Sequence, residues 1–244
     1  MDEDREQIIV ESNQNGEKIF SHAMTEFVSD PEACLCAKRS IIGDLIYGWG
    51  NAWSAQEEYL GCCLGHALRV RAPILECGSG LSSLLVGVVA KKRGYPHWVL
   101  EHMPIWAKKV QRYLDAYELD STVVCTKPLR DFGDFAWYDP PLQSMPDSFA
   151  LVICDGPPGN TKGGRYGLAS VMRDRLKAGC VVLLDDADRK KEREIARRWT
   201  SELCGTVDML GHSGDQYIKM TLVDKSSAIT LPGVAMRWSI GQVP

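Results

Sequence analysis

The chain alternates between short apolar runs and longer stretches in which apolar residues recur every three or four positions. Short apolar runs bounded by polar or turn-forming residues are typical of buried β-strands, and the longer spacing is typical of helices with one buried face. The apolar runs predict seven strands, at residues 73–77, 97–101, 121–125, 149–154, 180–185, 205–210 and 216–223.

Helical patterns fill the intervals between these strands. The alternation predicts a Rossmann-like, doubly wound α/β sheet that is mostly parallel, with helices on both faces. Only residues 212–215 separate the last two strands, which is too few for a crossover, so we expect one antiparallel edge strand. The predicted helix faces comprise Trp106, Val110, Tyr113, Leu114 and Tyr117; Leu168, Val171, Met172 and Leu176; and Ile195, Trp199 and Leu203.

The segment before the first strand has a different pattern. Residues 17–48 predict two or three helices, whereas residues 1–16 are polar and are expected to be loose. Ser54 followed by Glu57 is a capping-box pattern that predicts a helix start. We therefore expect an N-terminal helical cover over residues 1–53 and one α/β domain over residues 54–244.

Composition narrows the class of protein. The formal net charge of −4 disfavours a general nucleic-acid binder, and no apolar run reaches the roughly 18–20 residues that a membrane helix needs. The acidic N-terminus has no apolar core, unlike a secretory signal. The nine cysteines lack the paired spacing of a zinc site and fit small buried thiols in a reducing compartment. We expect a cytoplasmic protein that binds no membrane.

The run Leu75–Gly80 carries the first chemical signal. A buried strand ends in Glu76, and Gly78 and Gly80 then predict a tight turn into a helix N-terminus. Glycines let a ligand approach the backbone closely, and a carboxylate favours a ligand with a positively charged end. Gly78-x-Gly80-x-x-Ser83 also approaches the dinucleotide fingerprint, but Glu76 would repel a pyrophosphate.

Further carboxylates follow the other predicted strands. Glu101 lies about 20 residues after the glycine turn, where an acidic side chain can bind the hydroxyls of a ribose. Asp155 follows the fourth strand, and Asp185 and Asp186 follow the fifth. Ligands bind beyond the carboxyl ends of strands in open α/β sheets, so we expect these side chains to form one site.

Together these motifs resemble those of class I S-adenosylmethionine-dependent methyltransferases. The resemblance rests on Leu75-Glu76-x-Gly78-x-Gly80, Leu100-Glu101-His102, the run from Leu151 to Asp155, and the run from Leu176 to Asp186, and it covers about residues 54–223. It implies that S-adenosylmethionine is the cofactor. The cofactor-binding residues that it implies are Glu76, Gly78, Ser79, Gly80, Ser83, Glu101, His102, Met103, Leu129, Arg130, Asp155, Gly156 and Pro157.

The same resemblance implies a role for each part of that set. The turn at residues 76–80 would hold the methionine part of the cofactor, and Glu101 would bind the ribose hydroxyls. His102 and Met103 would flank the adenine, whose edge would contact residues 128–130. Asp155 would face the cofactor's amino group or the substrate, and Asp155 and Asp185 are the implied catalytic residues.

A finer resemblance is to the catechol and caffeoyl-CoA type O-methyltransferases. It implies that Asp155, Asp185 and Asp186 hold Mg²⁺ or another divalent cation, which would lower the pKa of a substrate hydroxyl. The chain departs from that pattern, because Asp186 replaces an asparagine and residues 156–159 read Gly-Pro-Pro-Gly. The alternative is that Asp155 binds the cofactor while Asp185 and Asp186 bind substrate or cap a helix starting near Asp188.

Other residues remain open from the sequence. Trp49, Asn51 and Trp53 either form a lid over the methyl pocket or anchor the N-terminal helices. Arg165 either meets an anionic substrate group or is simply solvated, and solvation is favoured.

We expect a methyltransferase that modifies a hydroxyl of a small molecule, with nucleic acid disfavoured as a partner. The alternatives are a non-catalytic module that binds S-adenosylmethionine and an NAD-dependent oxidoreductase. The oligomeric state stays open, with a homodimer as one option.

Overall fold

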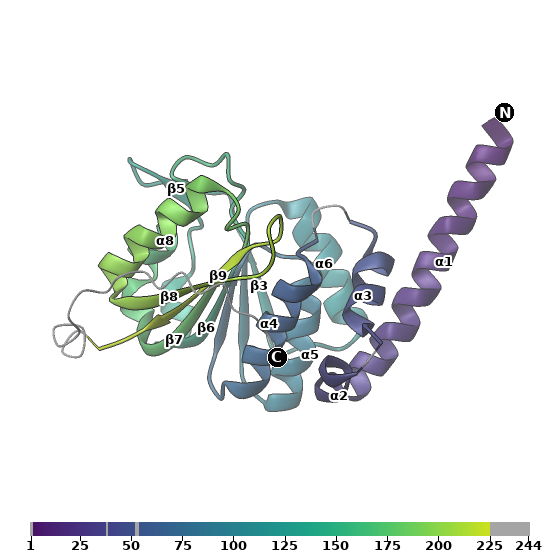
Figure 1. Cartoon of the computed structure of the whole chain (residues 1–244), viewed down its shortest axis with the longest axis horizontal. Coiled ribbons are helices and arrows are strands. Elements are labelled where there is room, and N and C mark those ends of the chain that lie inside the picture. The colour runs from purple at the N-terminus through teal and green to yellow at the C-terminus, as the bar shows by residue number, and fades with distance from the viewer. Residues whose placement is uncertain (1, 38, 52–53, 225–244) are drawn as a thin grey trace.

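The architecture is taken from a computed structural model that describes residues 2–37, 39–51 and 54–224. Its centre is a seven-stranded sheet with the order β3-β2-β1-β6-β7-β9-β8 (Figure 1). Each predicted strand is confirmed to within a few residues. The strands are β1 Ile74–Cys77, β2 His97–Glu101, β3 Thr122–Thr126, β6 Phe149–Cys154, β7 Leu176–Leu184, β8 Gly205–Leu210 and β9 Tyr217–Leu222.

The sheet is parallel except at one strand. β1, β2, β3, β6 and β7 pair in parallel, and β9 pairs antiparallel with both β7 and β8. The predicted antiparallel strand is therefore β9, which lies between β7 and the edge strand β8. A small hairpin of β4 Arg130–Asp131 and β5 Ala136–Trp137 stands apart from the main sheet and was not predicted.

Helices cover both faces because alternate strand residues point to opposite sides. Ile74 packs in one apolar cluster with α4, α5 and α6, whereas its neighbour Leu75 packs in a second cluster with α7 and α8. The flanking helices are α4 Glu57–Arg69, α5 Leu81–Arg93, α6 Pro104–Ala116, α7 Gly167–Val171 and α8 Lys190–Leu203.

Three further helices lie over the first face: α1 Asp2–Ser29, α2 Pro31–Cys36 and α3 Ile41–Trp49. The expectation that residues 1–16 are loose was wrong, since α1 begins at Asp2 and its first half extends away from the sheet (Figure 1). Residues 2–15 contain neither glycine nor proline and are rich in Glu and Gln, which favour helix without burial. No helix within the described ranges combines the length and apolarity needed to cross a bilayer.

Two local predictions were wrong. Ser54 does not cap a helix: α4 starts at Glu57, whose carboxylate instead accepts a hydrogen bond from Ser40, the side chain that caps α3. Leu176 does not belong to a helix face, because α7 ends at Val171 and Leu176 pairs with Phe149 as the first residue of β7. Pairing in the sheet outweighs the helical spacing of the apolar residues there.

The predicted boundary between residues 53 and 54 stays a prediction, because residues 52–53 and 225–244 lie outside the described ranges.

The tightest packing near the site is between α7 and β5. A β-carbon on Gly167 would overlap the ring of Trp137, which is fully buried. We expect Gly167→Ala to lower the free energy of unfolding by about 1–3 kcal/mol, because the indole has nowhere to move. Urea denaturation measures this. Gly65→Ala is the matched control: its β-carbon approaches only the end of the Arg69 side chain, at 3.7 Å, so helix propensity should raise stability slightly. Equal effects of both substitutions would contradict the packing argument.

Candidate functional site

The predicted site residues lie at the carboxyl ends of the central strands. β1 is the neighbour of both β2 and β6, and the chain crosses from one half of the sheet to the other between them. Such a switch point opens a crevice in doubly wound sheets, because successive crossovers leave in opposite directions. The turns that follow β1, β2, β6 and β7 therefore face the same edge, as expected from the positions of the predicted strand ends.

The turns after β1 and β6 are nearly in contact. Gly78 has φ 90°, a conformation that strongly favours glycine, and its amide donates to Leu100 O at 2.9 Å. A β-carbon on Gly78 would lie 3.1 Å from the amide nitrogen of Gly156, and one on Gly156 would lie 2.9 Å from Gly78 Cα. Glycine at both positions thus leaves bare backbone on the two sides of the crevice.

Side chains fasten the rest of the first turn. The amide of Gly80 donates to Ser83 Oγ at 3.1 Å, and the indole of Trp106 donates to the carbonyl of Ser79. Ser83 is fully buried and caps α5, so its observed role is structural.

Glu101 organises the segment after β2. One carboxylate oxygen accepts hydrogen bonds from the amide and hydroxyl of Ser79, at 3.0 and 2.7 Å. The other accepts from the amides of His102 and Met103, at 2.7 and 2.8 Å. Four donors fill the usual accepting capacity of a carboxylate. Glu101 thereby ties the glycine turn to the start of α6.

Glu76 faces inward. Its side chain is 1% exposed; one oxygen accepts from the hydroxyl of Ser82, and the other lies 3.0 Å from Nε2 of the buried His97. The other ring nitrogen of His97 contacts Thr122 at 3.2 Å. The contact between Glu76 and a cationic ligand stays a prediction, and in this structure its carboxylate ties β1 to β2 and α5.

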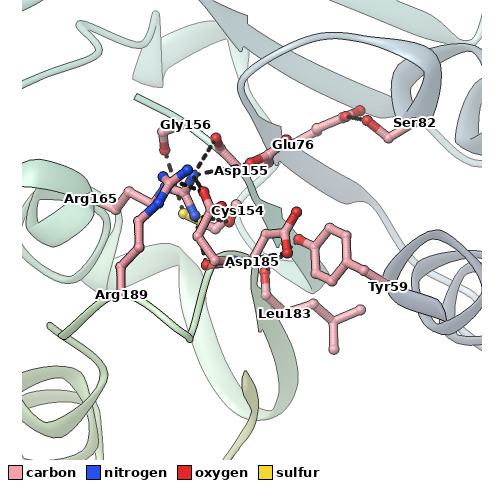
Figure 2. A network of polar contacts seen from close by, with 11 residues as sticks. Tyr59, Glu76, Ser82, Cys154, Asp155, Gly156, Arg165, Leu183, Asp185 and Arg189 are labelled. Carbon is pink, nitrogen blue, oxygen red and sulfur yellow. Dashed lines mark hydrogen bonds and ion pairs between the residues drawn. The ribbon is translucent and has the colours of Figure 1, made fainter. Parts of the chain in front are cut away.

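Arg165 links the ends of β6 and β7. Nη2 donates to Asp155 O at 2.7 Å, to Asp155 Oδ1 at 3.0 Å and to Asp186 Oδ2 at 2.6 Å, and Nη1 donates to Asp185 O at 2.8 Å. Figure 2 shows the guanidinium close to Asp155, with Arg189 beside it. The Arg165 side chain is 2% exposed, so the interpretation of Arg165 as a solvated residue was wrong.

Burial and like charges perturb the acidic groups at these ends. Burial raises the pKa of Asp155 to about 8; Arg165 opposes this shift, while Asp185 and Asp186 add to it. Burial also raises the pKa of Asp185 to about 6, against the hydrogen bond that it accepts from the Asp186 amide at 2.8 Å. Raised carboxyl pKa values in a crevice are typical of groups that exchange protons.

Asp155 keeps one oxygen available. Oδ1 accepts from Arg165, whereas no hydrogen bond to Oδ2 is found within the described chain, and about a third of the side-chain surface (33%) is exposed. It is therefore placed to accept a proton from a bound molecule.

The residues do not fit the predicted divalent cation. Over the described ranges, no group of three or more His, Cys, Asp or Glu side chains is arranged to hold a metal. This arrangement does not support metal binding by Asp155, Asp185 and Asp186, because Arg165 takes up the facing oxygens of Asp155 and Asp186. The alternative that Asp185 or Asp186 caps a helix starting near Asp188 is also not observed. α8 starts at Lys190, and neither carboxylate accepts a hydrogen bond from the first amides of that helix.

One residue at the crevice was not predicted. Tyr138 follows β5; it is 2% exposed, and its hydroxyl has no hydrogen-bond partner in the described ranges. A β-carbon on Gly156 would meet that hydroxyl, so Tyr138 Oη lies where the turns after β1 and β6 meet. No motif marks this tyrosine, because only the fold brings it beside Gly156.

The remaining predicted contacts lie along the rim. Met103 is 52% exposed, and His102 Nδ1 lies 3.1 Å from Glu101 Oε1. Leu129 is half-buried, and Arg130 pairs with Asp139 at 3.4 Å. Contact between these side chains and an adenine stays a prediction.

Trp49 is an anchor of the N-terminal helices. It is 5% exposed and packs with Phe20, Tyr113 and Trp106, while Lys109 Nζ lies 4.6 Å from its ring centre. The lid interpretation of Trp49 was therefore wrong, since the indole faces α1 and α6. Asn51 accepts a backbone hydrogen bond from Ser54. Trp53 lies outside the described residues.

Comparison with solved structures supports the fold. The precorrin-6y C5,15-methyltransferase of Geobacter metallireducens superposes with a TM-score of 0.54 at 15% identity, covering 72% of this chain and 92% of that chain. An O-methyltransferase from Bacillus cereus, in complex with SAH, gives a TM-score of 0.52 at 16% identity, covering 82% and 97%. The C-terminal domain of precorrin-6Y C5,15-methyltransferase from Rhodobacter capsulatus gives 0.50 at 13% identity, covering 71% and 91%.

Sequence comparisons add nothing to this. No known protein family matches the chain, and no curated protein does. At these identities the structural likeness concerns architecture. The chain has the Rossmann-like fold of the class I methyltransferases.

Proposed function

We propose that this protein is an S-adenosylmethionine-dependent methyltransferase that methylates a hydroxyl of a small molecule. The observation that carries the proposal is the position of Asp155: its free oxygen stands beside the glycine turns, at the switch point of a methyltransferase fold. The carboxylates around it disfavour an anionic acceptor and favour one that offers O–H donors.

The crevice fits the proposed cofactor. Gly78 and Gly156 let the turns after β1 and β6 approach each other at the switch point, and the buried Tyr138 hydroxyl beside Gly156 lacks a partner that a ligand atom would supply. To bind a ribose hydroxyl, Glu101 would give up one of its present hydrogen bonds. The Ser79 hydroxyl is the donor that can rotate away and be replaced by the ribose hydroxyl. When bound, S-adenosylmethionine would supply the methyl group: the acceptor oxygen would form a bond to the methyl carbon as the carbon–sulfur bond breaks. The electron pair of that bond would stay on sulfur.

Asp155 would perform the proton transfer. Its free oxygen would accept the proton of the acceptor hydroxyl, while Arg165 holds the other oxygen in place. A general base works best when its pKa lies near the working pH, and burial has raised the pKa of Asp155 to about 8. Asp185, the second implied catalytic residue, would help to position the acceptor.

One observation favours a second function, that of a non-catalytic cofactor-binding module. Both oxygens of Glu101 are already satisfied by the protein, so the fold stands without a ligand. Such a module would bind S-adenosylhomocysteine and would be indifferent to the loss of Asp155.

The cofactor assignment is tested by ligand binding. S-adenosylhomocysteine should raise the unfolding temperature and NAD⁺ should not. Glu101→Ala should weaken S-adenosylhomocysteine binding at least about tenfold in calorimetry, because the turn and the ribose lose a shared acceptor. Glu194→Ala, an exposed glutamate on α8, is the control. Stabilisation by NAD⁺ alone would refute the assignment.

Tyr138 should give effects of opposite sign. Tyr138→Phe removes a buried hydroxyl without a partner, so the free protein should become more stable by about 1 kcal/mol. The same change should weaken S-adenosylhomocysteine binding several-fold if the hydroxyl contacts the ligand. Thermal unfolding with and without ligand measures both. Unchanged affinity would show that Tyr138 Oη does not face the cofactor.

Asp155 should control turnover and its pH dependence. Because the base must be ionised, kcat/KM should rise with pH and level off above about pH 8. Asp155→Asn should lower kcat by about 10²–10³-fold with cofactor affinity retained. Asp208→Asn, an exposed carboxylate on β8, serves as control. Wild-type turnover by the Asp155 variant would favour another base.

A further inference from the structure

The environment of Arg165 Nη2 is similar to the coordination sphere of a hard cation. Asp155 O, Asp155 Oδ1 and Asp186 Oδ2 lie 2.7, 3.0 and 2.6 Å from this one nitrogen. Divalent cations of this class take oxygen ligands from carboxylates and carbonyls. Carboxylate oxygens of two of the three residues that the sequence suggested for a metal, Asp155 and Asp186, therefore lie beside a guanidinium nitrogen.

The charge at this position is permanent and held from several sides. The side chain is 2% exposed. Burial alone would lower the pKa of Arg165, but the opposing effect of Asp155, Cys154, Asp186 and Glu192 is larger and raises the pKa above its usual value, so the group stays charged at any working pH. Glu192 is fully buried, and neither of its oxygens has a hydrogen-bond partner in the described chain.

The segment that carries Arg165 is itself fastened. Lys191 on α8 donates to the carbonyls of Gly159 and Thr161, at 2.6 and 3.1 Å, and the indole of Trp199 donates to Tyr166 O at 3.2 Å. These bonds hold the loop on either side of Arg165 against α8. The guanidinium is thus pre-positioned by the fold, as a bound ion would be by its ligands.

We infer that Arg165 is a built-in cation that occupies the position of a divalent metal at these strand ends, so that the site works without one. Arg165 is then a positioning residue: it holds Asp155 Oδ1 and leaves Oδ2 toward the acceptor. The part of this inference that concerns turnover rests on the proposed function, whereas the part that concerns cation binding does not.

Divalent-cation binding tests the inference without any acceptor. The unfolding temperature of the whole chain is measured in EDTA and in millimolar MnCl₂. Wild type should show no difference. Arg165→Ala leaves the same oxygens around an empty position, so Mn²⁺ should raise its unfolding temperature by about 5 °C or more relative to EDTA. Asp186→Asn added to Arg165→Ala should abolish that response.

Arg189→Ala is the matched control. Arg189 donates to the same oxygen, Asp186 Oδ2, at the same 2.6 Å, but its side chain is 52% exposed. Removing it should neither create a response to Mn²⁺ nor change the effect of EDTA. An equal response in both variants would point to general charge relief rather than to the Arg165 position.

Two outcomes would overturn the inference: wild-type protein stabilised by Mn²⁺ through Asp186, or folded Arg165→Ala that ignores Mn²⁺. If Arg165→Ala folds under neither condition, Arg165→Lys decides, because it keeps one positive charge: a folded Arg165→Lys protein that ignores Mn²⁺ supports the inference. Loss of the fold in both variants would overturn it, because hydrogen-bond geometry, not charge, would then hold the strand ends. Methyl transfer should also be unaffected by EDTA; failure to bind S-adenosylhomocysteine would instead count against the proposed function alone.

Discussion

The arrangement of the whole crevice depends on one buried guanidinium. Three carboxylates at adjacent strand ends repel one another, and burial strengthens the repulsion because water no longer screens it. Arg165 supplies the opposing charge and also donates to backbone carbonyls of β6 and β7's turns. Arg165 thereby holds the turns after β6 and β7 at a fixed separation despite the repulsion between their carboxylates. Breaking such a pair from one side leaves an uncompensated buried charge, so the two strand ends and the orientation of Asp155 depend on each other.

The two glutamates of the resemblance divide into different physical roles. Glu76 lies under the sheet edge with His97 and Ser82, and Glu101 receives four donors from the surrounding loops. A carboxylate attracts a cationic ligand most strongly when one oxygen faces it, and Glu76 is only 1% exposed. Both glutamates bind neighbouring groups of the protein and so shape the backbone against which a ligand would lie. Shape and backbone donors, rather than a facing charge, would then select the ligand.

The hydrophobic pattern along the chain predicted the secondary structure but not the contacts between distant residues. The seven strands and their helices follow from apolar runs and spacing, and the strand-end carboxylates follow from the strands. Arg165 could not be placed, because its partners Asp155 and Asp186 lie 10 and 21 residues away and meet it only in the folded sheet. Tyr138 was not predicted for the same reason. The predictions for Ser54 and Leu176 were wrong because tertiary contacts can override a capping pattern or a helical spacing.

The aromatic cluster around Trp49 connects the N-terminal helices to the glycine turn. Trp49 packs edge-on against Trp106, and the Trp106 indole donates to the carbonyl of Ser79 within the glycine turn. Only one side chain therefore separates the helical cover from the backbone that a ligand would touch. A ligand that orders that turn would therefore also stabilise the packing of α1 and α3. By thermodynamic linkage, the packing of these helices would favour the bound ligand by the same amount.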